Sequence, residues 1–562
     1  MIRTASHSSQ SFGPCIQAQR SHSIHNQAIL EDSVDPPDLP NQEHQGLEKD
    51  IGNDERGNDE SLQARIERLG RERPKVFRSM WAEIAFVFSI CNSQIITEFF
   101  VSGFTVILPT LIQELDIPQT SSVWPATAFS LAIASTLLIF GRLGDMYGGY
   151  PVYVCGMIWL AVWSLVAGFS TSPLMLDFCR ALQGLGAAAY LPNGVLLMGS
   201  IYRPGPRKNL VFSIFGASAV AGFFIGIFFA GVVGQYTRWG WYFWTGSLLA
   251  AITAVSSVFS IPSDSAARRK NGITMDWLGS VLMVSGLTLT VYAITDSSHS
   301  PHGWKTPYIP TLLIVGCLLT VAAVYVEGWV AKLPLLPFDV FAIPSMKPLT
   351  LALLLNYGTL GIYLLYVTQY MQMFMGATPL QVVAWYIPMI LGGLILSTAG
   401  GFVLHLIPGK ALLVFSGAGW IGALLLFALA PLGASYWAFT FPSAIFATIG
   451  IDITFNIANI FITTQMPGER QGLAGGLINS ILHLGITFCL GFSDIIQAET
   501  IDRLGPLKSY KAIFWFGVAT ASVALLLMTF FVKIEKAKSD LTADEKRELE
   551  QAVLDERRSN AL

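Results

Sequence analysis

The stretch GRLGDMYGGY, residues 141–150, lies between two long apolar segments of the chain. Glycine permits tight turns and close approach of backbones, and four of these ten residues are glycines. Asp145 places an acid where the apolar segment ends. The stretch therefore predicts a tight turn that sends the chain back across the layer it has just crossed.

Apolar segments of the same kind recur along the whole chain. Each is about 20 residues long, which lets a helix cross a hydrocarbon core of roughly 30 Å. They are continuously apolar, whereas the strands of a membrane barrel alternate. They cover residues 83–112, 121–140, 150–169, 174–199, 209–234, 240–261, 277–295, 309–329, 348–375, 380–406, 410–430, 436–464, 471–494 and 511–533. The sequence predicts an all-α integral membrane protein with fourteen transmembrane helices.

The composition agrees with a chain that lives in the lipid bilayer. Of the 562 residues, 52% are hydrophobic and 13% are charged, too few polar side chains to cover a soluble protein of this length. The net charge of -3 offers no electrostatic footprint for nucleic acid. Most of the six cysteines fall in apolar segments, so a disulfide framework is not expected.

The charges gather at the two ends and in a few loops. Residues 1–79 are polar and predict a disordered tail. Basic residues between Arg65 and Arg78 directly precede the first apolar segment, and the positive-inside rule places such residues in the cytoplasm. An even number of spans brings the second tail, residues 536–562, to the same side. Both termini are therefore predicted to be cytoplasmic, and capping residues from Thr542 predict a short amphipathic helix in the second tail.

The sequence favours a transporter over an enzyme. It has no G-x-x-x-x-G-K-[ST] loop, so no nucleotide is expected as partner or direct energy source. It also lacks the H-E-x-x-H, G-x-S-x-G and C-x-x-C patterns, and its loops are short. We expect no metal site and no cofactor, and a membrane-embedded enzyme is a minor alternative.

One charged residue interrupts the fourth apolar segment. Arg180 shares a helical face with Gln183 and Gly184, at spacings of three and four residues. A cation inside a membrane is costly, so Arg180 should face the bundle interior or water. The alternative is an arginine that extends from the helix end toward the interface.

Acids and polar groups in other spans mark further candidate positions. Asp452 and Asn456 share a face of the twelfth segment, and Glu98 lies in the first. An acid within the membrane is a candidate proton carrier, with a structural hydrogen-bonded cluster as the alternative. Groups suited to an amphipathic organic ligand occur in the ninth and tenth segments, where they could equally be helix contacts: Asn356, Tyr366, Gln369 and Trp385.

These motifs together resemble the major facilitator superfamily. Residues 141–150 are similar to its loop motif G-x-L-x-D-x-x-G-R/K-R/K, and residues 180–184 to its R-x-x-Q-G motif. The matching residues are Gly141, Leu143, Asp145, Gly148, Arg180, Gln183 and Gly184, and Gly226 and Gly231 approximate the glycine pattern of the fifth helix in its antiporters. From about residue 80 to 535 the chain resembles the fourteen-span drug:proton antiporter branch, especially fungal aminotriazole-resistance-type efflux transporters.

The resemblance implies an architecture and a mechanism. Two six-helix bundles, 80–261 and 331–535, would enclose a substrate site, with an inserted helical hairpin and its flanking loops at 262–330. A proton gradient would drive export of a drug, toxin or secondary metabolite by alternating access. Asp145 would latch the cytoplasmic side, Arg180 would take part in proton coupling, and Asp452 or Glu98 would carry the proton. A monomer in the plasma membrane is expected, with the vacuolar or another internal membrane as the alternative.

Two departures from the family pattern leave the direction of transport open. Gly149 and Tyr150 stand where a basic pair usually follows the loop motif, and Ile227 stands where antiporters carry a proline. A uniporter or importer of a small solute on the same fold is therefore the alternative, followed by a transporter-derived sensor. The identity of the substrate does not follow from one sequence.

Overall fold

Helices form where the apolar segments predict them. The computed structural model describes residues 71–118, 122–202, 206–265, 273–300, 302–403, 407–466 and 471–534. All of these belong to one unit of the chain, Leu62–Leu562. Most of the predicted N-terminal tail, and the predicted C-terminal tail with its amphipathic helix, lie outside the described residues.

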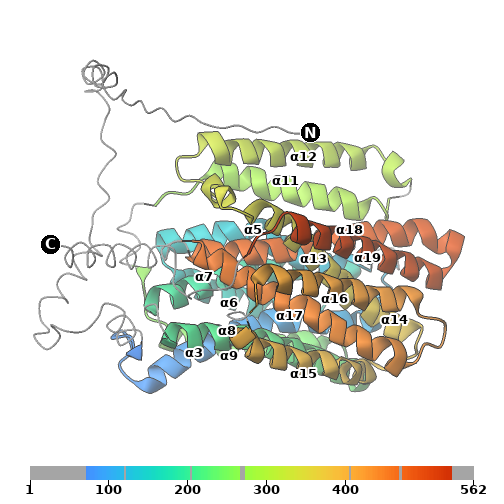
Figure 1. Cartoon of the computed structure of the whole chain (residues 1–562), viewed down its shortest axis with the longest axis horizontal. Helices are drawn as coiled ribbons and strands as arrows, with labels where there is room; N and C mark the ends of the chain where they lie inside the picture. The colour runs from blue at the N-terminus through green and yellow to red at the C-terminus, as the bar shows by residue number, and fades with distance from the viewer. Residues whose placement is uncertain are drawn as a thin grey trace, which may run out of the picture. The chain divides into compact units, whose positions relative to one another are not determined.

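The described part of the chain is built from helices and contains no strand. Figure 1 shows the long helices running side by side. The α-helices are α3 (Met80–Glu98), α4 (Phe104–Glu114), α5 (Trp124–Tyr147), α6 (Gly149–Ala167), α7 (Pro173–Ile201), α8 (Pro206–Tyr236), α9 (Gly240–Ser260), α11 (Trp277–Asp296), α12 (Tyr308–Tyr325), α13 (Met346–Ile362), α14 (Thr368–Met373), α15 (Pro379–Val403), α16 (Gly409–Leu429), α17 (Phe441–Thr464), α18 (Gln471–Leu504) and α19 (Pro506–Phe530). Short π-helical turns extend some of them, η1 (Phe99–Gly103), η5 (Val326–Val330), η7 (Tyr363–Val367) and η8 (Tyr436–Thr440), and η4 (Gly303–Lys305) and η6 (Phe338–Ala342) are 3₁₀ turns.

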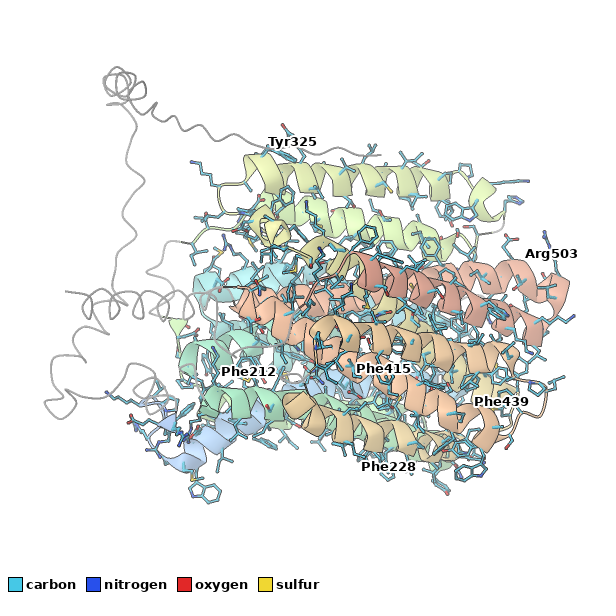
Figure 2. The ribbon with its side chains drawn as sticks, viewed as in Figure 1. Phe212, Phe228, Tyr325, Phe415, Phe439 and Arg503 are labelled. Carbon is cyan, nitrogen blue, oxygen red and sulfur yellow. The ribbon has the colours of Figure 1, made fainter. Side chains whose placement is uncertain are left out.

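Fourteen segments of the described chain are long and apolar enough to cross a membrane, which confirms the predicted number. Their bounds follow the predicted segments closely, except that α18 continues well past residue 494 to Leu504. Large apolar side chains stand on the outer surface, among them Phe228, Tyr325 and Phe415, which are 41%, 59% and 55% exposed (Figure 2). Such a surface suits lipid and not water. The cytoplasmic placement of the termini stays a prediction.

The turn predicted at residues 141–150 is much shorter than expected. Helix α5 continues to Tyr147 and α6 begins at Gly149, so Gly148 alone makes the turn. Its φ of 104° is one that favours glycine. The prediction of a loop beginning at Gly141 was wrong because glycines in a membrane helix also serve close helix packing, which the sequence pattern does not separate from turning.

The helices pack in two groups that meet each other. In the first group α7 packs on α5 and α6, and α3 on α8 and α9; in the second, α13 and α19 pack on α18, and α16 on α17. Between the groups, α5 packs on α18 and α8 on α15. Helices α11 and α12 lie side by side, and α11 contacts both α5 and α18 (Figure 1). This arrangement suits the predicted division at 80–261, 262–330 and 331–535, which stays a prediction because all three parts lie in one unit.

Candidate functional site

Arg180 is completely enclosed by the helices, and each of its three side-chain nitrogens donates a hydrogen bond. Its side chain on α7 is 1% exposed. Nε donates to the backbone oxygen of Pro125 at 3.0 Å, and Nη2 to the backbone oxygen of Phe100 at 3.1 Å. Nη1 donates to Oε1 of Gln183 at 3.1 Å. The guanidinium thus joins α7 to the first two spans, and the alternative of an arginine extending to the interface is wrong.

Aromatic rings complete the surroundings of the guanidinium. Its central carbon lies 4.2 Å from the ring centre of Phe104 and 4.4 Å from that of Phe129. The face of an aromatic ring attracts a cation, most strongly where water is excluded. Two rings, three neutral oxygens and an electrostatic interaction with Asp177 of the same helix therefore hold a charge at a depth where an isolated cation would be unstable.

The carbonyl of Phe100 lies in an irregular part of the first span. Residues Phe99–Gly103 form the π-helical turn η1 between α3 and α4. Such turns change the carbonyl pattern of a helix and are frequent at functional sites. Gly226 of α8 packs directly on this turn, since a Cβ at Gly226 would lie 2.7 Å from the Cα of Phe99. The predicted motif glycine thus has a defined use, to admit the widened turn beside α8.

The other residues of the R-x-x-Q-G motif support Arg180. Gln183 is fully buried and, while accepting from Arg180, donates to the hydroxyl of Ser164 on α6 at 3.1 Å. A Cβ at Gly184 would lie 2.4 Å from the backbone oxygen of Phe129 on α5. Gln183 therefore fixes the orientation of the guanidinium, and Gly184 lets α5 approach closely enough for the ring of Phe129 to cover it.

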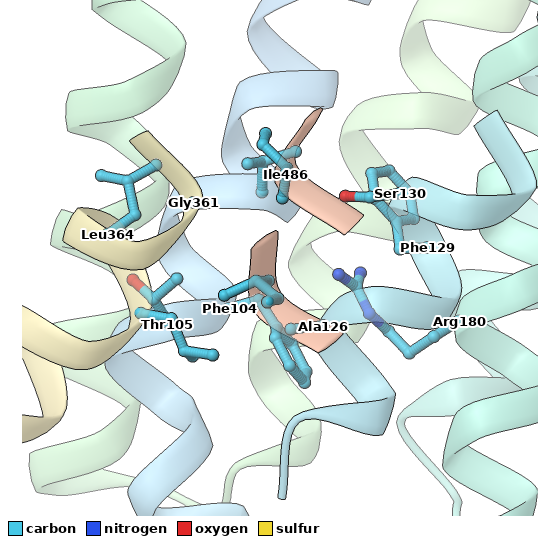
Figure 3. Close-up of a pocket in the computed structure, with 12 residues that line it drawn as sticks. Phe104, Thr105, Ala126, Phe129, Ser130, Arg180, Gly361, Leu364 and Ile486 are labelled. Atoms are coloured by element: carbon cyan, nitrogen blue, oxygen red, sulfur yellow. The ribbon is translucent and has the colours of Figure 1, made fainter. Parts of the chain in front are cut away.

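A small cavity of about 30 Å³ adjoins Arg180. Figure 3 shows the Arg180 side chain reaching from its helix toward the residues that line the cavity. The lining comes from both groups of helices: Val101, Phe104, Thr105, Ala126, Phe129, Ser130 and Arg180 from the first, and Gly361, Leu364, Leu365, Ile486 and Leu490 from the second. The volume suffices for about one or two water molecules. It lies where the two groups meet.

The two candidate acids lie away from the guanidinium, and no described contact joins them to it. Glu98 is half-buried in α3, where it accepts a hydrogen bond from Gln94 at 3.4 Å and faces Gly222 of α8. Asp452 is half-buried in α17 beside Gly393 of α15, since a Cβ built there would lie 3.2 Å from its Oδ2. The same position would lie 3.4 Å from Val220 of α8. Glu98 therefore borders α8, and Asp452 borders α15 at a place where α15 packs on α8.

The predicted substrate residues do not come together at one place. Tyr366 and Gln369 both contact Tyr510, whose hydroxyl donates to Gln369 at 2.8 Å. Asn356 is buried against Met528 of α19. Trp385 stacks on Tyr436 with ring centres 5.3 Å apart, and Asn456 is half-buried in α17. From the ninth span the cavity at Arg180 is lined instead by Gly361, Leu364 and Leu365, close to Tyr366 in the sequence.

The loop motif is held by backbone contacts that its pattern does not reveal. The carboxylate of Asp264, which follows α9, accepts from the backbone nitrogens of Gly149 and Tyr150 at 2.8 and 3.1 Å. Both residues that replace the usual basic pair thus bind an acid through their backbone nitrogens. No sequence signal marked Asp264, because the loop after the sixth span carries no recognisable motif.

Within the motif, the glycine with least room is Gly144. A Cβ there would lie 1.6 Å from Oδ1 of Asn193, whereas one at Gly141 would lie 3.5 Å from the nearest atom, on Pro192. Leu143 and Asp145 are half-buried, and Asp145 has interactions with its surroundings. Its action as a latch stays a prediction.

The glycine pattern of α8 also reaches the other group of helices. A Cβ at Gly231 would lie 2.5 Å from Cγ2 of Val383 on α15. Val383 is 4% exposed. Gly231 therefore permits close approach of α8 and α15, one of the places where the two groups of helices touch.

Comparisons with known proteins agree with this geometry. The family model of the Major Facilitator Superfamily matches residues 90–489. A low affinity ammonium transporter of Saccharomyces cerevisiae is 34% identical over 85% of this chain and 93% of its own length. The efflux pump terJ of Aspergillus terreus is 32% identical over 84% and 92%, and the aminotriazole resistance protein of Saccharomyces cerevisiae is 30% identical over 83% and 88%.

Solved structures share the fold at low sequence identity. A variant of the peptide transporter POT aligns over 78% of this chain and 93% of its own, with a TM-score of 0.56 and 15% identity. A variant of the nucleoside transporter NupG aligns over 80% and 100%, with a TM-score of 0.55 and 13% identity. Family and fold identify a multi-pass membrane transporter of small molecules rather than an enzyme. With its fourteen membrane-crossing segments and its fungal relatives, the chain belongs to the major facilitator superfamily, in the fourteen-span type of its drug transporters.

Proposed function

We propose that the chain exports a small organic compound in exchange for protons, by alternating access between the two sides of the membrane. The observation that carries the proposal is the carboxylate of Asp452. It lies in a membrane span, half-buried, and makes no hydrogen bond or ion pair with any described residue. An unpaired acid at that depth is costly unless it binds a proton or a cation. The efflux-pump names of two relatives support export.

Asp452 is placed where protonation can act on both groups of helices. It borders Gly393 of α15 within its own group, and Gly393 in turn lies beside Val220 of α8 in the other group. A carboxylate there stabilises an arrangement open to water, and a neutral carboxyl stabilises one in which α8 and α15 close. Binding and release of one proton would thus be linked to the motion, and the proton gradient would serve as the energy source with no cofactor.

Arg180 would act on the first span through its backbone. Its hydrogen bond ends at Phe100, two positions after Glu98. Movement of the guanidinium would therefore shift the π turn and with it the surroundings of Glu98. We propose this indirect route through the backbone because no described contact joins Arg180 to Glu98 or Asp452. Glu98 remains the second candidate for the proton carrier.

Import is the second candidate function. The relative that is 34% identical is named a low affinity ammonium transporter, and the chain departs from the antiporter pattern at Ile227. A uniporter or importer of a small solute would use the same fold and the same cavity. A transporter-derived sensor has no comparable observation in its favour.

The direction of transport can be tested in cells. We would express the chain in a yeast strain that lacks its own related transporters and measure accumulation of radiolabelled aminotriazole and of methylammonium. Export predicts that cells expressing the chain retain less of a transported probe than cells with an empty vector. Greater retention would support import instead and overturn the proposed direction.

The coupling ion is tested separately, in proteoliposomes with a pH-sensitive dye inside. A transported probe should move protons in the opposite direction when added to one side. Probe movement without proton movement would overturn the coupling and leave transport itself intact.

We expect a single chain to transport without a partner subunit, since both groups of helices that line the cavity come from it. A fluorescent fusion would test the predicted plasma membrane against the vacuolar membrane.

A further inference from the structure

Another acid, fully buried, lies where the α11–α12 hairpin meets the two groups of helices. Asp494 of α18 is 2% exposed at its side chain, and His299, just after α11, is 9% exposed. Nε2 of His299 lies 3.5 Å from Oδ2 of Asp494. Ser298 Oγ donates to the same Oδ2 at 2.5 Å. Trp124 of α5 covers the imidazole, with ring centres 6.4 Å apart.

The hydrogen bonds of His299 fix which ring nitrogen carries its hydrogen. Nδ1 lies 2.7 Å from the backbone oxygen of Thr295, and a carbonyl oxygen can only accept. Nδ1 also lies 3.0 Å from the hydroxyl of Ser298, whose single hydrogen is donated to Asp494. Nδ1 is therefore protonated, which leaves Nε2 of a neutral imidazole as an acceptor. Nε2 has no hydrogen-bond partner among the described residues. It faces a carboxylate oxygen, which is also an acceptor.

Two acceptors that face each other in a buried site are unfavourable unless one proton lies between them. We propose that His299 and Asp494 form a proton-binding site that holds the inserted hairpin against α18. One proton makes the pair complementary, as a carboxyl that donates to Nε2 or an imidazolium that donates to Oδ2. Without the proton, the two acceptors repel and the hairpin is released at this end.

The neighbouring groups are compatible with a single shared proton. Burial lowers the pKa of His299, against the opposing effects of the Thr295 carbonyl and of Asp296. The pair therefore titrates as one coupled unit that shares the proton. Asp296 is itself occupied by the hydroxyl of Tyr308 of α12 at 2.8 Å. Two phenols also lie near the pair: Tyr366 of η7 interacts with Asp494, and Tyr292 of α11 contacts Trp124, which covers the imidazole.

The site is placed to link a proton to the position of the hairpin. Among the contacts of α11 with the bundles are those with α5 of the first group and α18 of the second. Any rocking of one group on the other must therefore loosen or shift α11. A proton that strengthens the α11–α18 contact favours the arrangement described here. This inference requires neither a particular substrate nor proton-coupled exchange.

Cysteine cross-linking can measure the contact directly. A Cβ built at Gly491 of α18 lies 3.0 Å from Oγ1 of Thr295 of α11, so Thr295→Cys with Gly491→Cys fits a disulfide. A matched control lies within the hairpin, where a Cβ at Gly286 lies 2.5 Å from Oγ1 of Thr320. Gly286→Cys with Thr320→Cys shares the thiol chemistry but does not depend on docking. Both pairs would be placed in the full chain after its six native cysteines are replaced by alanine.

The readout is the rate of oxidative cross-linking of the docking pair divided by that of the control pair, between pH 5 and 9. We expect the ratio to fall by roughly tenfold as pH rises, the change produced by one unmade buried hydrogen bond. Asp494→Asn should keep the ratio high and flat, because its amide donates to Nε2 at every pH. His299→Gln should also remove the pH dependence of the ratio, because the glutamine amide donates to Oδ2 of Asp494.

Asp502→Asn, an exposed acid near the end of α18, should leave the profile of the parent unchanged. A flat ratio in the parent would overturn the proposal, and so would an unchanged pH profile in Asp494→Asn. The measurement uses no substrate and no gradient. It therefore gives the same result whether or not transport proves to be proton-coupled.

Discussion

Nη2 of Arg180 on α7 lies 3.1 Å from the backbone oxygen of Phe100 in the π turn of the first span. The acceptor of this bond is a backbone carbonyl, which no sequence motif identifies. It places the cation at the junction of two spans, with the cavity beside it.

Arg180→Lys should impair transport although it keeps the charge. A lysine ammonium is a compact charge and cannot reproduce the planar contacts to Pro125, Gln183 and Phe100 together. Each buried oxygen left unpaired costs about 1–3 kcal/mol, so we expect the initial rate of probe transport to fall about tenfold or more. Transport of aminotriazole or methylammonium in proteoliposomes would measure it. A rate equal to that of the parent would show that the fork geometry of arginine is not required.

Gly144→Ala should destabilise the chain far more than Gly141→Ala. The new methyl group at residue 144 would overlap Oδ1 of Asn193, whereas at residue 141 it would make an ordinary contact. Overpacking of this kind costs about 1–3 kcal/mol. The unfolding midpoint in detergent would compare the two variants. Equal midpoints would contradict the close approach of α5 and α7, and a lower midpoint for Gly141→Ala would reverse our ranking of these two glycines.

Gly231→Ala should change transport more than stability, because it acts between the two groups of helices. Its Cβ would press on Val383 of α15 and oppose closure of α8 on α15. A cost of about 1 kcal/mol in the closed arrangement shifts its population about fivefold. Val383→Ala should restore transport in the double variant by making room. Lack of restoration would mean that this contact does not limit the motion.

The number and order of the membrane helices could be predicted from the sequence, because a continuous apolar run has few other stable forms in a membrane. The importance of Arg180, Gln183 and Gly184 also followed from their shared helical face. Their partners did not, because Phe100 and Pro125 contribute backbone oxygens, which every residue has.

The candidate substrate residues illustrate a different limit. Asn356, Tyr366, Gln369 and Trp385 are polar or aromatic positions in the ninth and tenth spans, but sequence polarity does not fix the rotation of a helix against its neighbours. In the structure Asn356 faces α19 and Trp385 stacks on Tyr436, so each has a local partner. The pair of His299 and Asp494 was not predicted, since docking of the hairpin on α18 leaves no repeat or motif in the sequence.

The most direct test of the central claim is proton movement driven by a transported probe in proteoliposomes containing Asp452→Asn. Asn cannot take up a proton, so the variant should bind the probe but show no probe-driven proton movement. Asp502→Asn, which removes an exposed acid, is the matched control and should behave like the parent. Loss of proton movement in Asp452→Asn alone is the result we predict. Full proton-coupled transport by Asp452→Asn would contradict the account, because the proton would then be carried elsewhere.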